Sequence, residues 1–411
     1  MKAVVFTLGC KVNGYESASL VSGLKELGYE VSDRLSFADL YIVNTCAVTA
    51  EAEKKSRQAI ARVRKFNPAA KIIVTGCASQ KSPESFLEKE GVTLVTGAIN
   101  KDKIIDMLFD EGVKIDEGGE YYQRFNACQG LKTRAYVKIQ DGCDNFCSYC
   151  VIPYLRGRSR SRSVGSILDE LNSVSAKEVV LTGINLSKYS YQGTDLAALI
   201  EKLSDYPFRV RLGSLEDVVI DERLLTALKN LPDFAEHFHL SLQSGSDKVL
   251  KEMNRKYDCA AFLSSVELIG KYFPSAAITT DVIAGYSTET DEDFEKTYDF
   301  CRSVGFADIH CFEYSRREGT VGYSLRELPS AVKRERLEKL ISLKRSLKAE
   351  YIGTFIGKTL TFLPEDTEDG FTVGYTGNYI KIYVKEKCGE AFTKVRLSRL
   401  YGDGALADIA E

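Results

Sequence analysis

Three cysteines stand close together near the middle of the chain, at Cys143, Cys147 and Cys150. Their C-x3-C-x2-C spacing comes directly after residues 135–140, whose pattern predicts a strand. Thiolates are the ligands that hold iron–sulfur clusters, and four of them normally coordinate a four-iron cluster. With no fourth cysteine adjacent, the triplet indicates three coordinated irons and one iron open to a small chelating molecule. A structural zinc site is the alternative, but zinc usually takes four ligands, commonly in separated pairs.

Three more cysteines each follow a segment that predicts a buried strand in the first part of the chain. The cysteines are Cys10, Cys46 and Cys77, and the expected strands are 4–7, 40–44 and 71–75. These strands alternate with amphipathic helical segments, which predicts a parallel sheet covered by helices on both faces. The carboxyl ends of such strands meet at one edge, where ligands bind. The pattern therefore predicts a second metal–sulfur site, whereas unrelated buried core cysteines are the alternative.

Length and composition indicate an ordinary globular protein. The 411 residues are enough for two or three domains, and 44% are hydrophobic. The net charge is −3, so any nucleic-acid binding must come from a local basic patch. No apolar run approaches the roughly 20 residues that span a bilayer, and the first residues predict a strand rather than a signal peptide. We therefore expect no membrane association and a cytoplasmic location, where clustered cysteines act as ligands rather than disulfides.

Both cysteine sets resemble those of a known family. The central triplet is similar to that of the radical S-adenosylmethionine (SAM) superfamily, and the segments 7–17, 44–49 and 75–78 resemble the methylthiotransferases within it. The resemblance implies that Cys143, Cys147 and Cys150 are catalytic and hold a [4Fe-4S] cluster whose open iron is chelated by SAM. It implies that Cys10, Cys46 and Cys77 hold an auxiliary [4Fe-4S] cluster.

The middle of the chain predicts six strand–helix units, as in an incomplete βα barrel. The strands are expected near 135–140, 178–182, 208–212, 238–242, 278–283 and 308–312. By similarity to radical SAM enzymes, five residues at the carboxyl ends of these strands are expected to contact SAM: Gly183, Asn185, Ser214, Gln243 and Gly285. Residues 285–290 depart from the family's usual run, which contains a proline, and this predicts a looser loop.

Basic residues beside the central triplet are candidate binding groups. The segment 156–162 carries four arginines, whose planar forks suit carboxylates and phosphates. A solvated loop is the alternative. We expect Arg156 and Arg158 to bind substrate or SAM, and Arg255 to lie on a substrate-side surface. The three histidines, His237, His239 and His310, are interpreted as packing or surface residues.

The last segment changes to short alternating strands, which predicts a small antiparallel barrel. It interleaves tyrosines with lysines and resembles the TRAM domain, an OB-like RNA-binding module. Tyr375, Asn378, Tyr379 and Lys381 are its candidate RNA-binding residues. The predicted fold class is therefore α/β in three parts: an N-terminal parallel-sheet domain (1–120), a partial (βα)6 radical SAM barrel (130–348) and the small β-barrel (350–411).

The substrate follows from a finer resemblance. The runs 9–13, 138–143 and 377–380 look most like the tRNA N6-threonylcarbamoyladenosine methylthiotransferases. These enzymes methylthiolate C2 of that nucleoside beside the anticodon of tRNA. The alternatives are the isopentenyladenosine tRNA enzyme, a ribosomal-protein aspartate enzyme and, remotely, a non-catalytic Fe–S RNA-binding protein.

The resemblance also implies a mechanism and partners. One SAM methylates a sulfur at the auxiliary cluster, and another yields the radical that abstracts hydrogen from C2. The implied partners are the tRNA anticodon loop, a reducing protein such as a flavodoxin or ferredoxin, and a sulfur donor.

Overall fold

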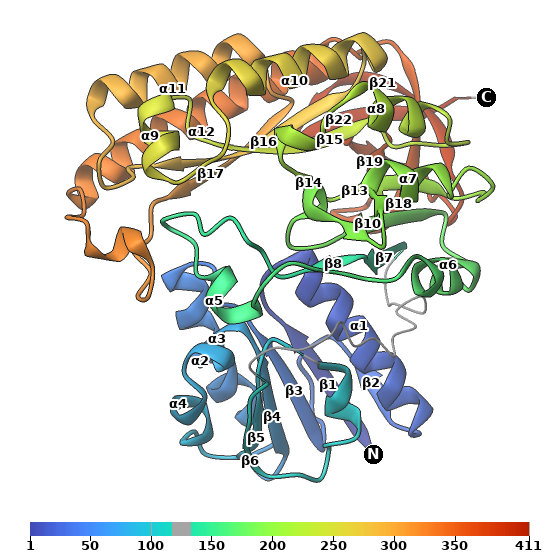
Figure 1. The fold of residues 1–411 in the computed structure, drawn as a ribbon. Helices are drawn as coiled ribbons and strands as arrows, with labels where there is room; N and C mark the ends of the chain where they lie inside the picture. Colours follow the sequence, from blue (N-terminus) through green and yellow to red (C-terminus); the bar gives the residue numbers. More distant parts are fainter. Residues whose placement is uncertain (100, 117–132, 411) are drawn as a thin grey trace.

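The computed structural model describes residues 1–99, 101–116 and 133–410 (Figure 1). The first part is a six-stranded parallel sheet with the order β2-β1-β3-β4-β5-β6. Alternating strand residues fill two apolar cores, one on each face of the sheet. The predicted doubly covered parallel sheet is therefore confirmed. Its elements are β1 (Lys2–Thr7), α1 (Lys11–Glu26), β2 (Glu30–Ser32), β3 (Leu40–Thr45), α2 (Ala50–Arg64), β4 (Lys71–Gly76), α3 (Cys77–Lys81), α4 (Pro83–Leu87), β5 (Val92–Thr96) and β6 (Gly112–Lys114).

The second part contains the six predicted parallel strands, in two sheets with the orders β13-β10-β7 and β14-β15-β16-β17. The predicted partial barrel is confirmed. Its strands are β7 (Arg134–Lys138), β10 (Glu178–Thr182), β13 (Arg209–Leu212) with its short continuation β14 (Ser214–Leu215), β15 (His237–Gln243), β16 (Ala277–Ala284) and β17 (Asp308–Glu313). Its helices include α5 (Ile152–Arg156), α6 (Val164–Asn172), α7 (Leu196–Glu201), α8 (Glu222–Lys229), α9 (Asp247–Glu252), α10 (Cys259–Tyr272), α11 (Asp291–Val304) and α12 (Ser330–Gly353).

The barrel strands present apolar residues to the helices and polar residues to the inside. On β15, Phe238, Leu240 and Leu242 belong to the apolar core beneath the helices. Successive strand residues point to opposite faces, so His237 and His239 face the inside of the barrel. We call the inward side of these strands the concave face. Its polar residues include Arg134, Tyr136 and Lys138 on β7, Glu178 on β10, Arg211 on β13, Thr279 and Asp281 on β16, and His310 on β17.

The C-terminal part is a closed five-stranded barrel with the order β18-β19-β20-β22-β21, as predicted, and its pairs are antiparallel except that β20 and β22 are parallel. The turn between two of its strands, residues 376–380, lies against the amino-terminal ends of the larger barrel's strands. Arg211 donates from its two Nη atoms to the carbonyls of Gly377 (3.2 Å) and Thr376 (3.1 Å). We call this end of the larger barrel the floor. The strands are β18 (Thr359–Glu368), β19 (Phe371–Thr376), β20 (Lys381–Val384), β21 (Thr393–Tyr401) and β22 (Gly404–Ile409).

Within the described part of the chain, no helix is both long enough and apolar enough to cross a bilayer.

A substitution of Arg211 tests how strongly the C-terminal barrel is attached to the larger barrel. Arg211 is buried, and its guanidinium pairs with buried Glu178 at 2.7 Å. We expect Arg211→Met to lower the free energy of unfolding by about 3–5 kcal/mol, because it leaves Glu178 with fewer cationic partners and frees two carbonyls. Urea unfolding followed by circular dichroism measures the loss. Arg223→Met is the matched control, because Arg223 pairs only on the exposed surface of α8; equal losses in the two variants would contradict the prediction.

Candidate active site

The central cysteine triplet lies on the loop that follows β8 (Gln140–Asp141). Cys147 is buried, while Cys143 and Cys150 keep partial solvent contact. Burial, reinforced by the neighbouring Cys147 and Cys143 sulfurs, raises the pKa of Cys150 to about 12, and burial also raises the pKa of Cys143. Without a metal, the thiols of Cys143 and Cys150 are therefore protonated at neutral pH. Metal binding must release those protons, which is ordinary for thiolate sites.

The donor sets favour clusters over single zinc ions. Structural zinc usually takes four protein ligands, whereas each of these sets offers three cysteines. Three thiolates can hold a four-iron cluster and leave one iron open.

Two polar side chains approach the sulfurs of the central triplet. Arg255 places Nη1 3.3 Å from the Cys147 sulfur, and Asn185 places Nδ2 4.0 Å from the Cys143 sulfur. Both also bind Glu216: Arg255 Nη2 lies 3.1 Å from Oε1, and Asn185 donates to Oε2 at 3.1 Å. Arg255 was expected on a substrate-side surface, but its side chain is only 6% exposed and lies beside the cluster loop. Glu216 was overlooked, although an acidic residue at a barrel strand end is a recognisable signal.

The other predicted SAM contacts lie at the carboxyl ends of the barrel strands. Gly183 packs against Gln140, where an added Cβ would come within 2.9 Å of the Gln140 carbonyl. Gln243 is buried with φ of 71°, and Ser214 is exposed on β14. Their contacts to SAM stay predictions, as does that of Gly285.

The loop after β16 is firmly held rather than loose. Gly285 has φ of 76°, which favours glycine, and donates its backbone N–H to Glu289 Oε2 at 2.8 Å. Arg336 on α12 donates to the same Glu289 oxygen at 2.7 Å. The predicted loosening is therefore wrong, because a buried acid–arginine pair fixes the loop where the family's proline is missing.

The N-terminal triplet gathers at one edge of the first sheet, as its sequence positions predicted. Cys10 is the N-cap of α1, Cys46 follows β3, and Cys77 begins α3. Burial, with added repulsion from the Cys77 and Cys10 sulfurs, raises the pKa of Cys46 to about 11. Gly9, with φ of 102°, lets the backbone pass the Cys46 sulfur, which an added Cβ would approach to 2.8 Å.

A buried network of charges lies between the two cysteine sets. We call it the ion network. Glu16 of α1 accepts from Lys101 at 2.5 Å, Lys138 at 2.8 Å and Arg156 at 2.9 Å. Asp141, two residues before Cys143, accepts from Lys138 at 2.9 Å and Arg156 at 3.1 Å. Burial alone would raise the pKa of Glu16, but Arg156, Lys101 and Lys138 hold it well below its usual range.

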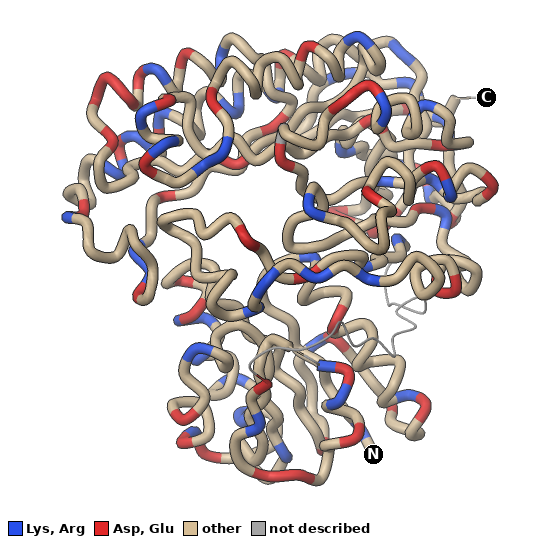
Figure 2. Tube along the Cα trace, in the orientation of Figure 1, with Lys and Arg blue, Asp and Glu red and all other residues tan. Residues whose placement is uncertain are grey.

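The two arginines expected to bind substrate take different positions. Arg156 is fully buried in the ion network, so the structure gives it a positioning role instead. Arg158 is 74% exposed, pairs with Asp144 at 3.3 Å and covers the ring of Phe146. Figure 2 marks Lys and Arg along the segment from β8 to α6, which passes between the first sheet and the barrel. Arg158 therefore stays a candidate for RNA contact.

The candidate RNA-binding residues of the C-terminal barrel lie against the floor. Tyr379 stacks on His237 at 4.4 Å, and Tyr375 and Tyr379 both lie beneath the Arg134 guanidinium. Asn378 is buried and donates to the Tyr351 hydroxyl at 3.0 Å, while Lys381 pairs with Glu368 and Asp403. The contacts of Tyr375, Tyr379 and Asn378 attach the C-terminal barrel to the rest of the chain, whereas those of Lys381 stay within the C-terminal barrel. RNA binding by these four residues stays a prediction.

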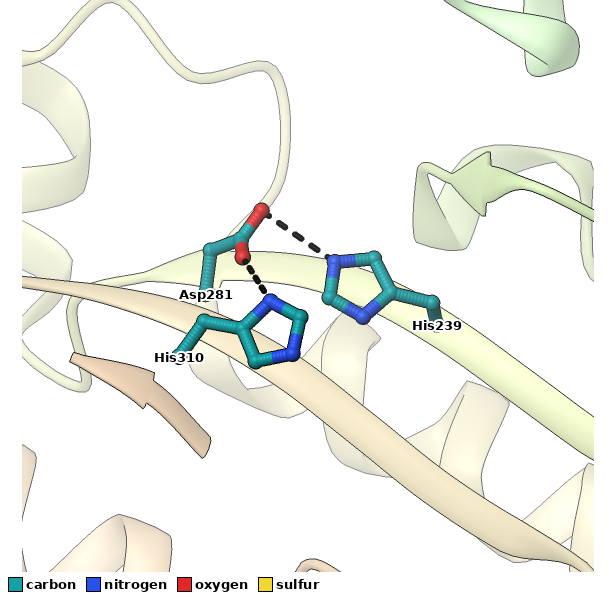
Figure 3. A group of neighbouring side chains, drawn as sticks. All are labelled: His239, Asp281 and His310. Atoms are coloured by element: carbon teal, nitrogen blue, oxygen red, sulfur yellow. Dashed lines mark ion pairs between the residues drawn. The ribbon is translucent and has the colours of Figure 1, made fainter. Parts of the chain in front are cut away.

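The three histidines, His237, His239 and His310, all lie on the concave face. His237 packs against Tyr379 and the His310 side chain is half exposed, in line with the interpretation as packing or surface residues. Two of them flank Asp281: His239 Nε2 and His310 Nδ1 each lie 3.2 Å from a carboxylate oxygen (Figure 3). Sequence reasoning missed this group, because three strands far apart in sequence supply it.

Known proteins match almost the whole chain. Family models match residues 2–97 (Uncharacterized protein family UPF0004) and 137–301 (Radical SAM superfamily). The threonylcarbamoyladenosine tRNA methylthiotransferases MtaB of Bacillus subtilis and Thermotoga maritima are 36% and 37% identical, covering 100% of this chain and 98% of each relative. The chain belongs to the radical SAM tRNA methylthiotransferases.

Other members of the family and one solved structure are more distant. The tRNA-2-methylthio-N(6)-dimethylallyladenosine synthase of Endomicrobium trichonymphae is 30% identical over 98% of this chain and all of that protein. The structure of the radical SAM methyltransferase TsrM from Kitasatospora setae has a TM-score of 0.54 at 13% identity, covering 76% of this chain and 74% of that one. That structure shares the fold of the chain.

The ion network predicts unequal roles for two neighbouring arginines. We expect Arg156→Met to cost about 3–5 kcal/mol of unfolding free energy, because it leaves the buried Glu16 and Asp141 carboxylates short of one cation. Arg158→Met, the matched control on the same segment, should change stability by less than about 0.5 kcal/mol. Urea unfolding of the two purified variants measures both values, and equal stabilities would refute a positioning role for Arg156.

Arg255 should influence the reduction potential of a cluster held by the central cysteine triplet. Removing a cation next to a cysteine sulfur makes reduction of an anionic cluster less favourable. We expect Arg255→Met to shift the reduction potential to more negative values, by about 60 mV for each 1.4 kcal/mol of interaction lost. A redox titration followed by electron paramagnetic resonance measures the shift, with Arg158→Met as the control. A potential equal to that of the wild type would rule out this role.

Proposed function

We propose that this protein is a tRNA methylthiotransferase that modifies C2 of N6-threonylcarbamoyladenosine beside the anticodon, giving the 2-methylthio nucleoside. The full-length similarity to two MtaB proteins at 36–37% identity carries the proposal. Relatives named for dimethylallyladenosine are less similar than these two, at 30–33%. The charged concave face gives independent support, because it suits a polar substituent on the adenine better than an apolar one.

The donor sets fit two clusters. Cys143, Cys147 and Cys150 would hold one [4Fe-4S] cluster with an iron left for SAM. Cys10, Cys46 and Cys77 would hold the auxiliary [4Fe-4S] cluster. When bound, the clusters and SAM supply the radical and the methylated sulfur that an unactivated aromatic C–H bond requires.

The residues of the chain position these groups. The ion network ties α1, which begins at the auxiliary loop, to β7 and to the segment after the central triplet. Arg255 and Asn185 orient the central loop through Glu216. The substrate adenosine lies in a single-stranded loop, so its base can leave the stack and enter between the two cysteine sites.

The partners follow from the reaction. Reductive SAM cleavage needs an electron donor such as a flavodoxin or ferredoxin, and repeated turnover needs a sulfur donor for the auxiliary site. A tRNA substrate supports the expected cytoplasmic location. The second candidate activity is methylthiolation of isopentenyladenosine, which the dimethylallyladenosine relative favours.

Mass spectrometry of tRNA nucleosides from cells with and without this gene tests the substrate. We expect the methylthio mark on threonylcarbamoyladenosine to disappear, with the parent nucleoside accumulating in its place. Loss of the mark on isopentenyladenosine instead would select the second candidate. Unchanged nucleosides would reject both tRNA activities.

Substitutions in the two cysteine sets should have different effects on the reaction. Cys147→Ala should abolish both 5′-deoxyadenosine formation and methylthiolation, because the cluster that binds SAM is lost. Cys46→Ala should retain reductive SAM cleavage but make no methylthio product. Quantifying both products in reconstituted enzyme measures this, with Cys301→Ala, a buried cysteine of the barrel core, as the control. Methylthiolation by the Cys46 variant would refute the auxiliary-cluster assignment.

A further inference from the structure

We propose that His239, Asp281 and His310 form a binding site for one divalent transition-metal ion of the zinc type on the concave face. The site uses no residue of either cysteine triplet, and it does not depend on which substrate the enzyme modifies. Two imidazole nitrogens and one carboxylate would bind the ion, and an oxygen atom of water or of a bound molecule would complete its coordination.

Three neighbouring parallel strands bring the group together. His239 lies on β15, Asp281 on β16 and His310 on β17, and the strand register sets Asp281 directly opposite His310. All three side chains point to the concave face, because an adjacent residue on each strand belongs to the apolar core beneath the helices. Ligands on strands are held more precisely than ligands on loops, which favours a preformed site.

The ligand atoms are spaced as a single ion requires. His239 Nε2 and His310 Nδ1 each lie 3.2 Å from a carboxylate oxygen of Asp281, and one ligand atom from each residue lies within 4.8 Å of the other two (Figure 3). Zinc bonds of about 2.0–2.2 Å in a tetrahedron put neighbouring nitrogen and oxygen ligands roughly 3.3–3.5 Å apart. The two nitrogen–oxygen distances are close to this value, so small side-chain adjustments are enough to bind an ion.

No lysine or arginine pairs with Asp281 in the described part of the chain. Its ion-pair partners there are His239 and His310 alone. The arginines of the concave face, Arg134 and Arg211, pair with Glu178 instead. Two neutral imidazoles and one carboxylate carry a single negative charge, and this set of nitrogen and oxygen donors suits a divalent transition-metal ion.

A neighbouring hydroxyl can hold His239 in the form that metal binding requires. A ligating histidine usually donates its other ring N–H to an oxygen, which fixes the tautomer and the orientation of the ring. His239 Nδ1 lies 2.9 Å from the Thr279 hydroxyl, which can accept this hydrogen bond. The same hydroxyl lies 2.8 Å from His237 Nε2 and can donate its own proton there. Thr279 therefore supplies the outer support that is typical of a metal-bound histidine.

Solvent access leaves room for a further ligand. The His310 side chain is 51% exposed and that of Asp281 is 23% exposed, whereas the His239 side chain is buried. Zinc sites with a structural role are closed by a fourth protein ligand, whereas catalytic sites have three and keep a position open. The group at Asp281 matches the open type, so water or an oxygen atom of a bound molecule can reach the ion.

Hydrogen bonding without a metal is the competing interpretation. Each histidine would then donate an N–H to Asp281, and His239 Nδ1 would accept a hydrogen bond from Thr279. This arrangement pairs the same atoms, so the contacts alone do not separate it from metal binding. The two interpretations differ in one measurable property, because only the metal site gives the protein an affinity for zinc that requires these three side chains.

The test measures zinc binding by the full chain after iron–sulfur cluster reconstitution. Zinc is added, the excess is removed by gel filtration, and the bound zinc is counted by mass spectrometry; competition with a chelator gives the affinity. X-ray absorption at the zinc edge identifies the ligands, because sulfur lies about 2.3 Å from zinc and nitrogen about 2.0–2.1 Å. This difference separates the proposed site from zinc held by cysteines that lack a cluster.

The variants are Asp281→Asn and His310→Phe, with His237→Phe as the matched control. His237 lies on the same strand as His239 and also contacts Thr279, but it offers no atom to the proposed site. His310 is half exposed, so its replacement disturbs the fold least. Circular dichroism of each variant shows that the fold is retained before zinc is measured.

We expect wild type and His237→Phe to retain about one zinc ion per chain with nitrogen and oxygen ligands only. Asp281→Asn and His310→Phe should each lower the zinc affinity by at least about 100-fold, because loss of an outer partner alone costs about 10- to 100-fold. Equal affinity in all four proteins, zinc bound through sulfur alone, or no zinc retained by wild type would each overturn the site. The nucleoside analysis tests the proposed function separately.

Discussion

The buried ion network between Glu16 and Arg156 is the constraint on which the arrangement of the active site depends. Two carboxylates and their cations are removed from water here, and each is stable only while its partners remain. The partners come from α1, from β7 and from the segment after the central cysteines. Separating the N-terminal sheet from the barrel would therefore expose unpaired buried charge. The network holds the two cysteine sites in fixed positions relative to each other. None of its residues has to contact the substrate to do so.

Local pattern predicted the elements and the cysteine positions well. Strand–helix alternation places loops at one edge of a parallel sheet, so Cys10, Cys46 and Cys77 could be brought together from sequence alone. The six barrel strands were predicted from the same alternation of strands and helices. The roles of Arg156 and Tyr379 could not be predicted, because an arginine or a tyrosine looks the same in sequence whether it meets solvent or another domain. Their partners, Glu16 and His237, are more than 100 residues away in the chain.

The concave face explains where the histidines lie. The apolar residues of β15 fill the core beneath the helices. The remaining members have to face inward, where burying so many polar groups is costly unless each is paired. The floor achieves this with its own ion pairs and the C-terminal turn. Above the floor, Thr279 pairs with His237 and His239, and Asp281 pairs with His239 and His310.

The C-terminal barrel also shapes the interior of the larger barrel. Its turn at 376–380 stacks on His237 and binds Arg211, so it closes the lower end of the larger barrel. His237 in turn contacts the Thr279 hydroxyl, which also contacts His239. The contacts made by this turn therefore serve to join the two barrels, and they reach the polar residues of the concave face from below.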